Sequence, residues 1–160
     1  MPSLPVCDQL YDLFRADKLR TIPRQHQKGL SAMEVLIVEN DSSDLQTASK
    51  AAQAAGFSGI AARSSAVMAK QYLEKGLQGE LALPDAIVLD LDLGYDSGFE
   101  LLRFWHSNPE LAKVPLVVWT ILEDHYREIC KLFKVSAYVN KAEGSSVLRQ
   151  VLSGLPRLVA

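Results

Sequence analysis

The chain has 160 residues and a formal net charge of −2 at pH 7, with 17 Lys and Arg residues against 19 Asp and Glu residues. This balance gives no indication that the protein binds nucleic acid or an anionic membrane. An apolar fraction of 48% can bury the core of one soluble domain, and we expect neither a signal peptide nor a membrane span.

Residues 1–32 are predicted to be an extension that precedes a single domain at 33–155, with a short tail at 156–160. The extension contains apolar residues at helical spacing and then a basic stretch, KLRTIPRQHQKG, without an acidic residue. The apolar face of this short helix comprises Leu10, Leu13 and Phe14. Two interpretations stay open, of which composition favours the first: a solvated linker, or a helix that docks on a partner or on a second copy of the chain.

From Glu34 onward, short apolar runs alternate with amphipathic segments. The runs are of strand length, and their apolar character predicts burial on both faces of a sheet. The predicted strands cover 35–38, 58–63, 86–89, 115–119 and 136–140. The predicted helices cover 42–56, 65–76, 98–106, 123–133 and 144–155.

Two of the helices begin with a Ser and a Glu or Gln at the spacing of a capping box, Ser43 with Gln46 and Ser97 with Glu100. Five strand–helix units in strict alternation predict an α/β fold, a doubly wound parallel sheet of five strands with helices on both faces.

Polar residues gather where the predicted strands end. In a doubly wound sheet, the carboxyl ends of the strands form the edge that carries the chemistry. The residues at that edge are Glu39, Asn40, Asp41, Asp90, Asp92, Thr120 and Lys141. Each of them alone is an ordinary turn, cap or loop residue. Acids grouped with one hydroxyl and one lysine suit phosphoryl chemistry, because a carboxylate can be the nucleophile while other oxygens hold Mg²⁺.

Four segments carry a resemblance to a known family: VLIVEND, PDAIVLDLDLGYDSGFELL, VPLVVWT and AYVNK. In order and spacing they resemble the receiver domain of two-component response regulators, which has the flavodoxin-like (CheY-like) three-layer fold. NPELAKVPLVVWT also resembles the small stand-alone regulators associated with bacterial phytochromes. The resemblance implies a two-component phosphorelay, in which a sensor histidine kinase phosphorylates an aspartate with Mg²⁺ bound alongside.

The family roles pass to matching positions of this chain. Asp90 matches the phosphoacceptor, Thr120 the switch hydroxyl, Lys141 the lysine that pairs with aspartate or phosphate, and Tyr138 the aromatic residue that changes rotamer. The metal ligands implied are Glu39, Asn40, Asp90 and the backbone carbonyl of Asp92.

Three residues depart from the family pattern. Asn40 stands where the family has an acid that binds the metal directly, so Mg²⁺ binding is expected to be weak. Ile121 stands where a very small residue usually follows the switch hydroxyl, and it is expected to narrow access to Asp90. Ala142 replaces the proline that commonly follows the lysine.

Three functions stay open. The first is a stand-alone receiver that is phosphorylated on Asp90 and signals by contact with a downstream protein. The second is a receiver-like interaction module that acts without phosphorylation. The third, a remote one, is a haloacid dehalogenase-type phosphatase, because IVLDLDLG resembles the nucleophile motif of those enzymes. In that family the nucleophile strand comes first, whereas here acids precede Asp90, so an enzyme is not expected.

The two cysteines, Cys7 and Cys130, form no metal-type pair. We interpret them as reduced thiols in a cytoplasmic protein, although a disulfide between them stays open. No DNA-binding output segment is expected after Leu155, so the expected partners are proteins: a sensor histidine kinase and a downstream target. A homodimer stays open as well.

Overall fold

A parallel sheet of five strands forms the centre of the described structure, a computed structural model that describes residues 32–156. The strands run in the order β2-β1-β3-β6-β7. Their bounds are β1 Glu34–Val38, β2 Gly59–Arg63, β3 Ala86–Leu89, β6 Leu116–Thr120 and β7 Ala137–Asn140. The predicted N-terminal helix, the basic stretch and residues 157–160 of the predicted tail lie outside the described residues.

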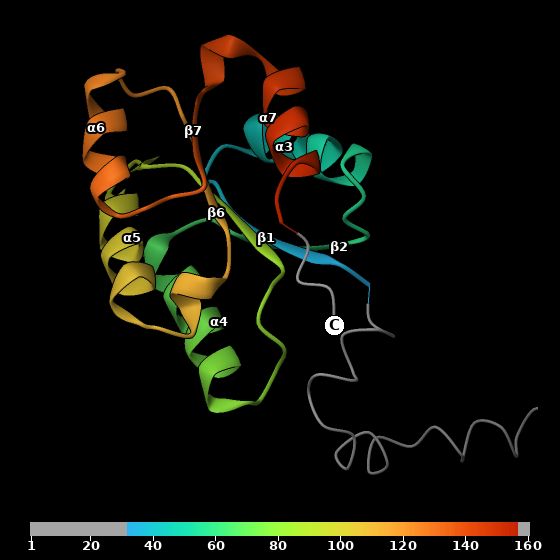
Figure 1. The fold of residues 1–160 in the computed structure, drawn as a ribbon, viewed down its shortest axis with the longest axis vertical. Coiled ribbons are helices and arrows are strands. Elements are labelled where there is room, and N and C mark those ends of the chain that lie inside the picture. The colour runs from blue at the N-terminus through green and yellow to red at the C-terminus, as the bar shows by residue number, and fades with distance from the viewer. Residues whose placement is uncertain (1–31, 157–160) are drawn as a thin grey trace, which may run out of the picture. The chain divides into compact units, whose positions relative to one another are not determined.

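In the described part of the chain, five α-helices cover both faces of the sheet. Figure 1 shows α3 and α7 on one face and α4, α5 and α6 on the other. Their bounds are α3 Ser42–Ala54, α4 Ala66–Gln78, α5 Gly98–Ser107, α6 His125–Leu132 and α7 Ser145–Ser153. Short 3-10 helices are η2 Leu111–Lys113 and η3 Lys141–Glu143. The predicted doubly wound, flavodoxin-like sandwich is confirmed. Within residues 32–156, no helix has the length and apolar character needed to cross a membrane.

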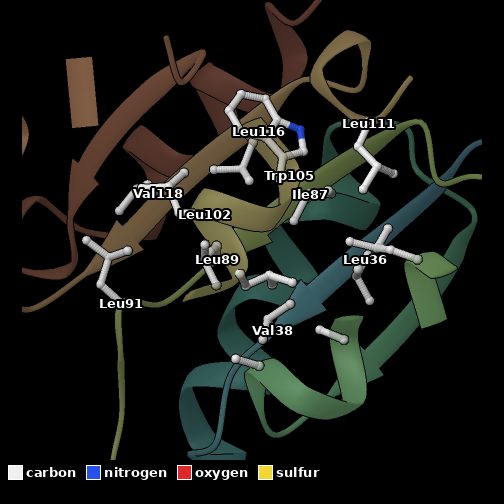
Figure 2. Close-up of a cluster of buried hydrophobic side chains, with 14 of the residues drawn as sticks. Leu36, Val38, Ile87, Leu89, Leu91, Leu102, Trp105, Leu111, Leu116 and Val118 are labelled. Carbon is white, nitrogen blue, oxygen red and sulfur yellow. The ribbon is translucent and has the colours of Figure 1, made fainter. Parts of the chain in front are cut away.

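Two clusters of buried side chains hold the three layers together, one on each face of the sheet. In β1, Leu36 and Val38 pack toward α4 and α5, whereas Val35 and Ile37 pack toward α3 and α7. Figure 2 shows the first cluster, in which strand residues meet Leu102 and Trp105 of α5. Successive side chains of a strand point to opposite faces, so a strand buried on both faces must be apolar throughout.

The helix starts differ in part from the prediction. Helix α3 is capped by Asp41, whose carboxylate accepts the N–H of Asp44 at 2.9 Å, so the capping box predicted at Ser43 is wrong. The reason is that the chain is still extended at Asp41, which places Ser43 inside the helix. Ser97 does cap α5, but its hydroxyl accepts the N–H of Phe99 at 3.3 Å instead of forming a capping box with Glu100.

A small antiparallel hairpin, absent from the prediction, joins β3 to α5. It consists of β4 Asp92–Leu93 and β5 Asp96–Ser97. The carboxylate of Asp96 accepts the N–H groups of Ala66 and Val67, at 2.6 and 3.2 Å, and so ties the hairpin to the start of α4. This satisfies backbone donors that have no partner inside the helix.

Gly98 lies against the backbone that carries Asp90. A β-carbon on Gly98 would overlap the carbonyl oxygen of Asp90 and lie 2.7 Å from the Cα of Leu91. Both neighbours are backbone atoms, so they cannot turn aside as a flexible side chain would. The approach of α5 to the end of β3 therefore requires glycine at this position.

We predict that Gly98→Ala lowers the free energy of unfolding by about 1–3 kcal/mol, the usual cost of forcing extra atoms into a packed site. Urea unfolding followed by circular dichroism measures it. The matched control is Gly154→Ala, whose new β-carbon would have 3.5 Å as its shortest contact. An equal effect of both substitutions would refute the close-approach explanation.

Candidate functional site

The carboxylate of Asp90 is buried at the end of β3, with 3% of the residue exposed. Its Oδ1 accepts the N–H of Asp92 at 3.0 Å and the hydroxyl of Thr120 at 2.7 Å. Its Oδ2 accepts the ammonium of Lys141 at 2.9 Å. A buried anion is stable only when it is paired and hydrogen-bonded, and Asp90 meets both conditions.

The strand order explains why these residues meet. The order reverses between β1 and β3, so the chain leaves β1 for α3 on one face and leaves β3 for α5 on the other. Such a switch point leaves a crevice at the carboxyl ends of the strands. Glu39 follows β1, Asp90 follows β3, Thr120 ends β6, and Lys141 follows β7. The structure thus brings together four of the predicted site residues.

Lys141 is the centre of the site. Its ammonium donates to Glu39 Oε2 at 2.7 Å, to Asp44 Oδ2 at 2.7 Å and to Asp90 Oδ2 at 2.9 Å. A lysine ammonium has three protons, so every donor is in use. Burial by itself would lower the pKa of Lys141, but the hydrogen bonds to Asp44, Glu39 and Asp90 outweigh it and raise the pKa above its usual value. Lys141 is therefore a fixed positive charge.

Glu39 is a second buried carboxylate, with 2% of the residue exposed. Its Oε1 accepts the N–H of Asp41 at 2.9 Å, and its Oε2 accepts Lys141. Burial raises the pKa of Glu39, while the hydrogen bonds from Lys141 and from the Asp41 backbone offset part of that rise. Glu39 thus depends on Lys141 to stay charged.

Asp44 belongs to the site although the sequence did not place it there. It lies in the first turn of α3, where its side chain is 40% exposed, and it reaches Lys141 from the solvent side. An acid in the first turn of a helix is common, because it interacts well with the free N–H groups there. The available signal was the position of that turn, directly after β1 and at the same edge as Asp90.

Tyr138 holds the loop that follows β6. It is 7% exposed, and its hydroxyl donates to the carbonyls of Leu122 and Glu123 at 3.1 and 3.2 Å. The guanidinium of Arg127 stacks over its ring at 4.9 Å and donates to its carbonyl at 2.9 Å. Burial raises the pKa of Tyr138 to about 12, so the hydroxyl stays a hydrogen-bond donor.

The remaining predicted residues lie at the rim. Asn40 is exposed, and its Nδ2 is 3.4 Å from the position of a β-carbon on Gly94. The side chain of Asp92 is also at the surface, whereas its N–H bonds Asp90. Ile121 is 66% exposed at the end of β6. The carboxylate of Asp41 caps α3, so it does not take the place of the missing acid at Asn40.

The oxygen donors at this edge suit a hard divalent cation. Glu39 and Asp90 offer carboxylates and Asn40 an amide oxygen, and Mg²⁺ is held in proteins by one or two carboxylates together with waters. Among residues 32–156, no three His, Cys, Asp or Glu residues are grouped as a metal site, which agrees with the use of both buried carboxylates by Lys141. The types of donor present suit Mg²⁺, and two of them carry a negative charge.

The donors around Asp90 suit this carboxylate to react with an anionic group. A carboxylate at a crevice, flanked by an ammonium, a hydroxyl and a backbone N–H, can take up an anionic electrophile because these donors neutralise the charge that arrives. The Thr120 hydroxyl bonds Asp90 Oδ1 and the Lys141 ammonium bonds Oδ2, so each carboxylate oxygen has its own side-chain donor.

Comparison with known proteins gives likeness in structure. No protein-family model and no curated protein matches the sequence. A phosphorylated cyanobacterial phytochrome response regulator, RcpA, matches with 25% identity, over 78% of this chain and 91% of that one, at a TM-score of 0.65. The bacteriophytochrome response regulator RtBRR matches with 25% identity, over 81% and 82%, at 0.66.

The Mn²⁺-bound form of response regulator Rcp1 matches with 23% identity, over 76% of this chain and 90% of that one, at a TM-score of 0.62, which shows the shared fold. A divalent cation thus occurs in a protein of this fold. The strand order, the buried aspartate after β3 and the likeness to phytochrome-associated regulators agree with one another. The described part of the chain has the CheY-like receiver fold and is similar in structure to phytochrome-associated response regulators.

Proposed function

We propose that this protein is a stand-alone response regulator that accepts a phosphoryl group on Asp90 from a sensor histidine kinase and signals by protein–protein contact. The observation that carries the proposal is the convergence of Lys141, Thr120 and the Asp92 N–H on a buried aspartate at the switch point. The likeness to a phosphorylated regulator supports it. The proposed role is that of a signalling module in the cytoplasm, and not of an enzyme.

The proposed transfer exchanges one bond for another. A carboxylate oxygen of Asp90 attacks phosphorus, a P–O bond forms, and the P–N bond to the kinase histidine breaks. The electron pair of that bond goes to the imidazole nitrogen, which leaves as the neutral ring after protonation. Lys141 lowers the repulsion between the two anions, and Thr120 offers its hydroxyl to a phosphoryl oxygen.

Mg²⁺ would be held by Glu39, Asn40, Asp90 and the backbone carbonyl of Asp92. When bound, it supplies positive charge to the phosphoryl oxygens. Because Asn40 brings an oxygen without a charge, we propose that binding is weak.

The loop after β6 can transmit a change at Asp90 to the surface of the protein. The Leu122 N–H donates to the Thr120 hydroxyl at 3.4 Å, and the Leu122 carbonyl accepts Tyr138 and Asn140 at 3.1 Å. When Thr120 turns to a phosphoryl group, the Leu122 N–H loses its acceptor, and the Tyr138 contact is free to change with it. We infer that a downstream protein reads the surface of α6, β7 and α7.

A receiver-like module that acts without phosphorylation is the second candidate. It is favoured by the full use of the Lys141 protons within the protein and by Asn40 in place of an acid. In that case the charge cluster only holds the fold, and partners bind the unmodified protein.

We predict that the protein gains one phosphoryl group from acetyl phosphate with Mg²⁺, and that Asp90→Asn gains none because the amide is not nucleophilic. Intact-protein mass spectrometry measures the added mass. Glu110→Gln is the matched control, an exposed acid beside η2, and it should behave as the parent does.

Phosphorylation that persists in Asp90→Asn would place the site elsewhere. If the parent gains no phosphoryl group from any donor or kinase and Asp90→Asn keeps partner binding, the module without phosphorylation is the correct interpretation.

Asn40→Asp is predicted to lower the Kd for Mg²⁺ roughly tenfold, which corresponds to about 1.4 kcal/mol, because it restores a charged ligand. Titration calorimetry compares the variant with the parent. A Kd that does not change would remove Asn40 from the metal site.

Ile121→Ala is predicted to speed both gain and loss of the phosphoryl group several-fold, because a smaller side chain admits the donor and water. The rate of loss is followed by mass spectrometry after the donor is removed. Leu132→Ala, which trims another exposed aliphatic side chain, on α6, is the control. Equal rates in parent and Ile121→Ala would show that Ile121 does not limit access.

A further inference from the structure

Asp44 differs from the other two acceptors of Lys141 in its exposure. The side chains of Glu39 and Asp90 are 1% and 4% exposed, whereas that of Asp44 is 40% exposed. All three bonds to the ammonium are nevertheless short, between 2.7 and 2.9 Å. Lys141 is thus shared between two buried carboxylates and one that water can solvate.

A phosphoryl group on Asp90 needs a hydrogen bond from the Lys141 ammonium, whose protons are all bound to carboxylates in this structure. The ammonium has three protons and three carboxylate acceptors, so an incoming phosphoryl oxygen can be bound only if one acceptor gives way. Release of Glu39 or of Asp90 would leave a buried carboxylate without its partner, which is costly. Release of Asp44 costs less, because water replaces the ammonium at an exposed carboxylate.

We propose that Asp44 is a positioning residue that competes with the incoming phosphoryl group for the ammonium of Lys141 and thereby slows phosphorylation of Asp90. The inference rests on the proposed function, since it concerns the same aspartate. Asp44 acts through Lys141, and among the described residues its carboxylate makes no hydrogen bond to Asp90. It adds a restraint that neither Asn40 nor Ile121 supplies.

The electrostatics of Lys141 agree with this role. Burial lowers the pKa of the ammonium, whereas the hydrogen bonds to Asp44, Glu39 and Asp90 raise it. The Asp44 bond is as short as the Glu39 bond, at 2.7 Å, so a phosphoryl oxygen has to replace a formed contact before it can bind Lys141.

The test compares the initial rate of phosphoryl gain from acetyl phosphate, with Mg²⁺, in the full chain and three variants. Asp44→Asn should be about tenfold faster than the parent, the factor that roughly 1.4 kcal/mol in the barrier produces. Asp44→Glu keeps a carboxylate near Lys141 and should restore a slow rate. Asp41→Asn is the charge control: it also removes one negative charge beside Glu39, and asparagine remains a good helix cap.

The pattern of rates decides between the explanations. A fast Asp44→Asn with slow Asp44→Glu and Asp41→Asn supports competition for Lys141. Equal acceleration by Asp41→Asn and Asp44→Asn would reduce the effect to net charge and overturn the proposal. An unchanged or slower Asp44→Asn would overturn it as well, while leaving phosphorylation of Asp90 in place. No phosphoryl gain in any variant would overturn the proposed function and this inference together. Thermal unfolding shows whether each variant is folded. If Asp44→Asn is not folded, Asp44→Ser takes its place in the test.

Discussion

The ammonium of Lys141 is the interaction on which the functional edge depends. It binds Glu39 after β1, Asp90 after β3 and Asp44 at the start of α3. These residues are separated from Lys141 by 102, 51 and 97 positions in the sequence. Two of the three carboxylates are buried, and without the lysine they would be uncompensated anions side by side. The lysine also lies 4.9 Å above the ring of Trp119, which places a π face under the charge. The Lys141 side chain therefore neutralises the buried carboxylates and holds them in position.

The backbone around Asp90 is fixed by contacts of another kind. Gly98 allows α5 to approach the carbonyl of Asp90, and Asp96 ties the intervening hairpin to the start of α4. The Asp92 N–H then points at the Asp90 carboxylate. This side of the site is held by backbone geometry, whereas the opposite side is formed by the side chains of Lys141 and Thr120. A receiver needs both: an acceptor that stays in place and donors that can change partner.

The sequence alone determined the fold and most of the edge. Apolar runs alternating with amphipathic segments predict a parallel sheet, and in such a sheet all strands end on the same side. The sequence therefore predicts that one edge of the sheet carries Glu39, Asp90, Thr120 and Lys141. Asp90 stands out because four apolar residues precede it, which predicts a carboxylate at the end of a buried strand. Asn40 and Ile121 stand out as departures at defined positions of the family pattern, and their effects stay predictions.

Only the tertiary structure decided which of these groups touch. Asp41 and Ser43 are both good cap residues, and the choice fell on Asp41 because its N–H is held by Glu39 at the end of β1. Asp44 looks like an ordinary acid in a first helical turn until the fold brings Lys141 to it. The hairpin before Gly98 is too short to leave a periodic pattern. Local sequence preferences determine the helices and strands. Contacts between residues about a hundred positions apart depend instead on how the layers pack, and no short segment of the sequence determines that packing.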